Sequence, residues 1–169
     1  DRKALEAGVL ASLDEALDLL VADREAEGRR LGKIVGGQGD AIARLSKDAS
    51  KLATLQPAAL KARLQQQVAD ILGAAAGLSE ERLLQEVALL ATKADVREEL
   101  DRLTVHVGAA RELFSNDGAI GRRLDFLAQE FNREANTLCS KSQDAALTNI
   151  GIELKTVIDQ FREQAQNIE

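Results

Sequence analysis

The feature that most constrains this chain is a long apolar repeat in its first third. From Leu13 to Leu52, apolar or small residues recur at close to heptad spacing, the pattern of a long helix that packs against other helices. The repeat keeps its phase through the glycine cluster at residues 36–39 (Gly-Gly-Gln-Gly), where a loop would normally reset it. One long, coiled-coil-like helix is therefore predicted over about residues 3–53. Its glycines either admit a close helix contact or mark a bend.

A phosphate-binding loop is the alternative interpretation of this glycine cluster. Such a loop needs a strand before it and a Lys-Ser/Thr pair after it, because the backbone amides and the lysine together hold the phosphates. The sequence has neither feature here. We therefore interpret the glycines as part of the helix.

The rest of the chain also follows helical periods. Four Phe, one Pro and no Trp or Tyr among 169 residues are typical of helical bundles and argue against a β-sandwich or barrel. Pro57 predicts a break after the first helix, and Ser79 a helix N-cap. The predicted fold is all-α, with long antiparallel helices in a hairpin or bundle arrangement. We expect one domain, residues 1–169, with sub-regions 1–54 (long helix), 58–76 (short helix) and 80–169, the last holding helices at about 80–114, 120–139 and 144–167.

Charge and cysteine content limit the functional classes. The net charge of −6 argues against wholesale nucleic-acid binding, although a local basic patch is compatible with it. A single cysteine, Cys139, excludes an internal disulfide framework and suits the cytoplasm. No apolar run is long enough to span a membrane, so we expect no membrane partner. The chain does not begin with Met, and Asp1 already lies in a helical pattern, so we expect a fragment that lacks an N-terminal part.

A polar seam between two of the predicted helices carries the functional signal. The turn at residues 115–118 (Ser-Asn-Asp-Gly) is short, so the helices on either side should be antiparallel neighbours. Residues at equal distances from that turn should therefore lie at the same level. Counting outward pairs His106 with Gln129 and Glu130, Arg102 with Arg133 and Glu134, and Glu99 with Asn136.

Two interpretations of this seam are open from periodicity alone. Carboxylates with one imidazole can hold a hard divalent cation such as Mg²⁺ or Mn²⁺, and neighbouring arginines fit phosphate oxygens. Alternatively, pairs such as Glu99–Arg102 and Arg102–Glu134 are structural ion pairs that join the helices, with His106 at the edge of the core. Periodicity alone favours the ion pairs. Cys139 is interpreted as a small boundary residue, because no His lies near it in sequence.

Several segments resemble the C-terminal signature of the bacterial YicC/YloC family. They are Glu98-Glu99-Leu100-Asp101-Arg102-Leu103, His106, Gly121-Arg122-Arg123-Leu124-Asp125-Phe126-Leu127, Gln129-Glu130, Asn132-Arg133-Glu134-Ala135-Asn136-Thr137 and Ser140-Lys141. The resemblance implies a cytoplasmic, divalent-metal-dependent (Mn²⁺ or Mg²⁺) endoribonuclease, hexameric when intact, that cleaves RNA including small regulatory RNA. The alternative is a non-catalytic, oligomeric helical scaffold that binds RNA or an exoribonuclease partner.

The resemblance also turns the seam into a candidate site. It implies metal ligands at Glu99, His106, Glu130 and Glu134, of which His106, Glu130 and Glu134 are the catalytic candidates. Candidate RNA-binding residues are Arg102, Arg122, Arg123, Arg133 and Lys141 for the phosphates, with Gln129, Asn132 and Asn136 positioning them. The chain departs from the family at Cys139, at the glycine cluster and in the absence of the family's N-terminal domain.

Overall fold

The computed structural model describes residues 2–74, 80–115 and 118–168, and these form five helices without a strand. The all-α prediction is therefore confirmed for the described chain. The helices are α1 (Arg2–Ala74), α2 (Glu80–Lys93), α3 (Arg97–Phe114), α4 (Gly121–Lys141) and α5 (Ala145–Ala165).

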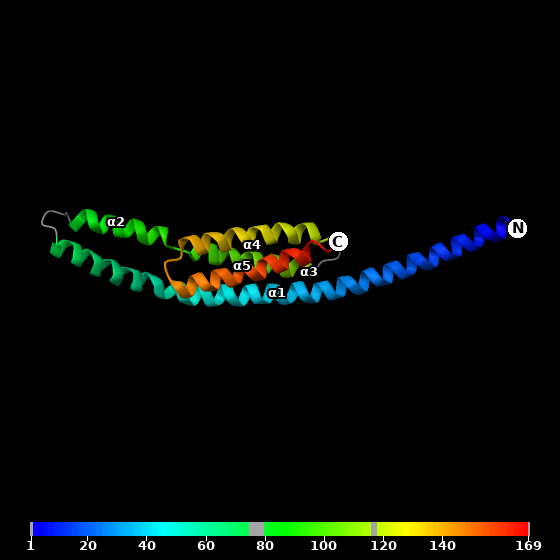
Figure 1. Ribbon diagram of the computed structural model, residues 1–169, viewed down its shortest axis with the longest axis horizontal. Coiled ribbons are helices and arrows are strands. Elements are labelled where there is room, and N and C mark those ends of the chain that lie inside the picture. Colours follow the sequence, from blue (N-terminus) through cyan, green and yellow to red (C-terminus); the bar gives the residue numbers. More distant parts are fainter. Residues whose placement is uncertain (1, 75–79, 116–117, 169) are drawn as a thin grey trace.

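The centre of the molecule is a four-helix bundle made by α1, α3, α4 and α5. The middle of α1 packs against α3 and α5, and α4 completes the ring by packing against the same two helices. Within the bundle α1, α3, α4 and α5 run in alternating directions, while α2 runs the same way as α3, as Figure 1 shows. The apolar stripes meet in one core, whose largest fully buried side chains include Val35, Ile42, Leu103, Leu124, Phe131, Leu138, Leu154 and Phe161.

The first helix extends past this bundle at both ends. Residues 2–30 project alone at one end, and the last part of α1 runs beside α2 at the other (Figure 1). The apolar repeat continues along the projecting arm, where Leu13 and Leu17 are 52% and 49% exposed. The stripe that is buried from Leu31 onward is thus open to solvent in the arm.

The predicted break at Pro57 is wrong, because α1 is continuous through it. A proline removes one backbone N–H donor and crowds one carbonyl, which weakens a helix at one point without having to end it. The residues that follow, rich in Ala, Leu and Gln, favour helix strongly. The predicted long and short helices are therefore one element of 73 residues.

The prediction of a single helix over 80–114 is also wrong, because α2 ends at Lys93 and α3 begins at Arg97. The Asp95 carboxylate accepts a hydrogen bond from the backbone N–H of Arg97 at 3.0 Å and pairs with its guanidinium at 2.6 Å. These bonds hold the pKa of Asp95 down at about 2, with the side-chain bond of Arg97 as the largest cause. An Asp before two glutamates is a helix-start signal, which the apolar periodicity had masked.

The glycine cluster lies inside α1. An added Cβ at Gly36, Gly37 or Gly39 would meet nothing within 4 Å, so of the two interpretations of the cluster, the one of a close helix contact has no support at these positions. Two other glycines do admit close packing. Gly121 lies against the backbone carbonyl of Ile168, and Gly151 lies against Cys139, which is half-buried.

Two further predictions fall outside the described residues, namely the Ser79 N-cap and the middle of the turn at 116–117. Gly118, at the end of that turn, has a φ of +117° that suits glycine. None of the described helices combines the length and the apolar character that crossing a bilayer requires.

Candidate metal centre on the α3–α4 seam

The site lies on the polar edge of the contact between α3 and α4. Leu103 and Val107 of α3 pack into the same core as Leu124 and Phe131 of α4. This packing fixes the rotation of both helices, so the residues next to the apolar stripes must face each other along the edge of the seam. The antiparallel pairing predicted from the short turn is confirmed.

Three potential metal ligands converge on this edge. One ligand atom each from His106 of α3 and from Glu130 and Glu134 of α4 lie within 4.8 Å of one another. Glu130 and Glu134 are one helical turn apart, so both side chains leave the same face of α4. Octahedral ligands with bonds of about 2.1 Å lie about 3 Å apart when adjacent and about 4.2 Å apart when opposite, so the side chains would have to close in by about 1 Å or more around an ion.

The His106 ring is held in place but incompletely bonded. It stands edge-on to Phe131, with the ring centroids 6.0 Å apart. Its Nε2 atom is buried and has no hydrogen-bond partner in the described structure. A buried nitrogen without a partner is costly, and a bound cation would satisfy it. The imidazole therefore fits the metal-ligand role implied by the sequence.

Glu134 is the most deeply buried charge of the group. It is 2% exposed, and its Oε1 lies 3.4 Å from Nη1 of Arg102 on α3. Arg102 also donates to Glu98 on its own helix. The neighbouring carboxylates, Glu98 first and then Glu134, raise the pKa of Arg102 above its ordinary value. The predicted Arg102–Glu134 pair is therefore present, and it lies directly beside the three-ligand group.

Glu99 forms a second charged contact at another level of the seam. The Lys141 ammonium donates to Oε1 of Glu99 at 2.8 Å, and Oε2 of Glu99 is buried without a partner. Glu99 precedes His106 by two helical turns, roughly 10 Å along α3, and it lies outside the three-ligand group. The structure therefore separates Glu99 from the other predicted metal ligands and pairs it with Lys141 rather than with Asn136.

The predicted amide residues lie on the other side of α4. Asn132 donates to Asp159 of α5 at 3.0 Å and accepts a bond from Asn136 at 2.9 Å. Gln129 donates to Asp125, which in turn accepts from Arg162 of α5. Gln129 and Asn136 lie at the levels of His106 and Glu99 by the count from the turn, but their hydrogen bonds go to Asp125 and Asn132 of α4, which in turn bond to α5.

The remaining predicted cations are free at the surface. Arg122, Arg123 and Arg133 are exposed and make no ion pair within the described residues. Sequence reasoning missed two partners, Glu98 and Asp159. The Glu98–Arg102 pair could have been predicted, since the two residues have the i, i+4 spacing of a helical ion pair. The Asn132–Asp159 contact could not have been predicted from the sequence, because Asp159 belongs to α5, whose rotation only packing determines.

Comparison with known proteins covers most of the chain, the site included. Residues 49–169 match the family described as endoribonuclease YicC-like, C-terminal. The chain belongs to this family. The resemblance found in the YicC-like signature residues is thereby confirmed, and all three converging ligands lie within the matched range.

Two relatives of this YicC-like chain carry the name "Probable endoribonuclease YicC". The protein of that name from Haemophilus influenzae is 40% identical over 169 residues, which are 100% of this chain and 58% of the relative. The one from Clostridioides difficile is 34% identical over 158 residues, 94% of this chain and 54% of the relative. The chain thus spans little more than half the length of these relatives.

Proposed function

We propose that this chain is the metal-binding portion of a divalent-metal-dependent endoribonuclease that hydrolyses RNA phosphodiester bonds in the cytoplasm. The observation that carries the proposal is the convergence of His106, Glu130 and Glu134 around a buried, unpartnered imidazole nitrogen. The names of the two relatives support RNA as the substrate. The family resemblance is our reason to include small regulatory RNA among the proposed substrates and an exoribonuclease as a proposed partner.

The donor set favours one of the two proposed cations. His106, Glu130 and Glu134 would hold the ion, one imidazole with two carboxylates. Carboxylates suit both Mg²⁺ and Mn²⁺, whereas imidazole is a softer ligand that favours transition metals. We therefore propose Mn²⁺ as the preferred ion. Bound there, a divalent ion supplies Lewis-acid stabilisation of the phosphate and makes water a stronger acid.

The chain's own residues would orient the substrate around this centre. Arg102 places a guanidinium beside Glu134, where it can hold a phosphate oxygen next to the three-ligand group. Arg133 lies on the exposed side of α4, one residue before Glu134, and offers a second cation. Lys141 is tied to Glu99, so we propose that it steadies the seam rather than contacts RNA.

The projecting arm of α1 supports assembly as a homo-oligomer, a hexamer in the intact protein. Leu10, Leu13, Leu17 and Leu20 form one heptad-spaced stripe, and each is about half exposed. Such a stripe on a single helix is larger than a soluble monomer usually leaves uncovered. A second copy of the arm would cover it by coiled-coil packing.

The deciding experiment is cleavage of a labelled, structured RNA by this chain with Mn²⁺, Mg²⁺ or EDTA. We expect cutting with Mn²⁺ and none with EDTA. Glu130→Gln and His106→Ala should each lower the cleavage rate by at least about 100-fold, the usual cost of a lost ligand or proton-transfer group. Glu153→Gln is the matched control, because this exposed glutamate of α5 lies away from the seam.

Circular dichroism establishes that each variant is folded. Cleavage that survives in both site variants would place the chemistry elsewhere. If the chain binds Mn²⁺ and RNA but cuts nothing, the alternative function is favoured, in which the bundle is an oligomeric scaffold for RNA or an exoribonuclease.

A further inference from the structure

A basic stripe follows the outer face of α1 and is unrelated to the metal centre. Residues 29–51 carry six cations and two carboxylates, a net charge of +4 in a chain of net charge −6. The helical period places the stripe opposite the buried face of α1 that holds Val35, Ile42 and Ala49. Its members, three or four residues apart, are Arg30, Lys33, Gly37, Asp40, Arg44, Lys47 and Lys51.

The two carboxylates of the segment are already neutralised. Asp40 accepts from Arg111 of α3 at 2.7 Å, which adds a further cation at the edge of the stripe. Asp48 pairs with Lys51 at 2.6 Å. Lys51, and to a lesser extent Arg44 and Lys47, lower the pKa of Asp48, as expected in a positive local field. Arg29 and Arg30 are paired with Glu25 and Glu27, just before the segment. The net positive surface is therefore the middle of the stripe, around Lys33, Arg44 and Lys47.

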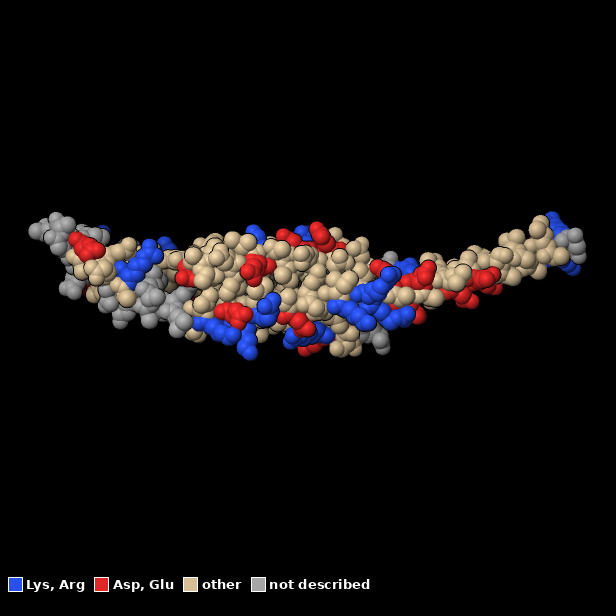
Figure 2. Space-filling model, turned by 60° about the horizontal axis from the view of Figure 1, so that its bottom comes forward, with Lys and Arg blue, Asp and Glu red and all other residues tan. Residues whose placement is uncertain are grey.

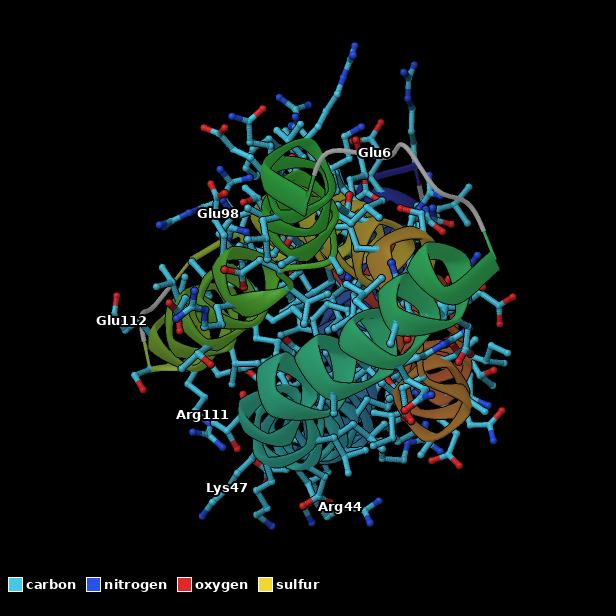
Figure 3. The ribbon with its side chains drawn as sticks, turned by 90° about the vertical axis from the view of Figure 1, so that its left-hand side faces the viewer. Glu6, Arg44, Lys47, Glu98, Arg111 and Glu112 are labelled. Atoms are coloured by element: carbon cyan, nitrogen blue, oxygen red, sulfur yellow. The ribbon has the colours of Figure 1, made fainter. Side chains whose placement is uncertain are left out.

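Three cations of the stripe have no partner in the described structure. Lys33, Arg44 and Lys47 are exposed and make no ion pair there. Figure 2 shows Lys and Arg side chains gathered along the face formed by α1. In Figure 3, Arg44, Lys47 and Arg111 extend from the α1–α3 edge into solvent. The Lys33, Arg44 and Lys47 groups are therefore available to an external anion, whereas Arg111 is paired with Asp40.

The shape of the stripe suits an extended polyanion. From Lys33 to Lys47 the helix rises about 21 Å, a length that spans several phosphates of a nucleic-acid strand. Between Lys33 and Arg44 the surface carries Gly37, where an added Cβ would meet nothing. A phosphate backbone can therefore approach the helix closely at its centre. No large apolar residue lies in the stripe, which argues against insertion into a membrane surface.

We infer that this stripe of α1 is an RNA-backbone-binding surface, separate from the metal centre, that holds the strand whose cleavage is proposed above. The inference rests on the proposed function for the choice of RNA. The two surfaces lie on different sides of α3, since Arg111 reaches α1 while His106 faces α4. Backbone contacts by point charges give affinity without sequence preference.

The test is the affinity of this chain for a fluorescein-labelled, single-stranded RNA in EDTA, measured by fluorescence anisotropy over a series of salt concentrations. The variant is Lys33→Gln combined with Arg44→Gln and Lys47→Gln. Three lost phosphate contacts should reduce the slope of log affinity against log salt by about 2, and the affinity by about 100-fold at about 0.1 M salt.

The matched control removes the same charge elsewhere. Arg63→Gln, Arg82→Gln and Lys93→Gln together alter exposed residues at the other end of α1 and in α2. We expect this control to keep nearly all of the wild-type affinity and salt slope. Equal losses in variant and control would overturn the inference, because only the total charge would then matter.

Other outcomes separate this inference from the proposed function. If the wild-type protein cleaves RNA and the stripe variant has an unchanged salt slope, the RNA-binding role of the stripe would be overturned and the proposed endoribonuclease function would stand. If RNA binding depends on the stripe but no Mn²⁺-dependent cleavage is seen, the RNA-binding role of the stripe would be supported and the proposed endoribonuclease function would be overturned. Binding to phosphatidylserine vesicles but not to RNA would overturn the inference in favour of a membrane surface.

Discussion

Replacing Glu130 by Gln should stabilise the protein in EDTA and abolish its stabilisation by Mn²⁺. In the absence of metal, the Glu130 and Glu134 carboxylates lie within 4.8 Å and repel each other. That repulsion is about 1 kcal/mol at the dielectric constant of water and about 3 kcal/mol at an effective value near 20. Glu130 is half-buried, and Arg102 offsets part of the charge of Glu134. We therefore expect Glu130→Gln to raise the free energy of unfolding by about 1 kcal/mol.

The metal-bound state should respond in the opposite way. A ligand at a concentration of about 100 times its dissociation constant stabilises the folded state by about 2.7 kcal/mol. For a chain of this size, 1 kcal/mol shifts the melting temperature by about 2–4 °C. Saturating Mn²⁺ should thus raise the melting temperature of the wild type by about 5–10 °C, and that of Glu130→Gln by much less.

The assay is differential scanning fluorimetry of both proteins and of Glu153→Gln in EDTA and across a Mn²⁺ titration. Glu153→Gln should follow the wild type in both conditions, because Glu153 is exposed and distant from the seam. The reasoning fails if Glu130→Gln lowers the melting temperature in EDTA and Mn²⁺ stabilises it as much as the wild type. Glu130 would then be a structural ion-pair residue.

Two further predictions concern the fold. Gly121→Ala should destabilise the protein by about 1–3 kcal/mol in urea unfolding, because the new Cβ would collide with the backbone carbonyl of Ile168. At Gly108 of α3 a new Cβ would meet nothing within 4 Å, so Gly108→Ala should stabilise the protein by about 0.5–1 kcal/mol through the higher helix propensity of Ala. If both variants destabilise the protein, the cause would be a shared effect on the helicity of α3 and α4 and not the collision with Ile168. Asp95→Ala should lower the free energy of unfolding by about 1 kcal/mol at pH 7. This is the usual value for a hydrogen bond at the start of a helix, and we add little for the ion pair with Arg97 because it is exposed. The pKa of Asp95 is lowered to about 2, so this difference should shrink as the pH falls from about 4 to about 2, and a pH-independent difference would exclude the carboxylate as its cause.

The sequence by itself determined the all-helical character and one register, although it predicted a break at Pro57 and missed the one between α2 and α3. Apolar periodicity is a local property of each segment, so it located the long first helix and the three helices of the seam and C-terminus. The short turn then fixed the antiparallel pairing, because equal distances from a turn bring residues to the same level. His106 beside Glu130, and Arg102 beside Glu134, followed from that counting alone.

The tertiary structure decided what lies to either side of each helix. Gln129 and Asn132 stand close to Glu130 in the sequence, but Gln129 bonds to Asp125 of α4, and Asn132 bonds to Asp159 of α5. Glu99 and Glu134 are both buried, yet only Glu134 lies near the His106 imidazole, while Glu99 pairs with Lys141. Periodicity reports how far a residue lies from the apolar stripe, whereas the rotation of packed helices selects its neighbour. Only that packing separated the three converging candidate ligands from the ion pairs around them and left the basic face of α1 uncovered.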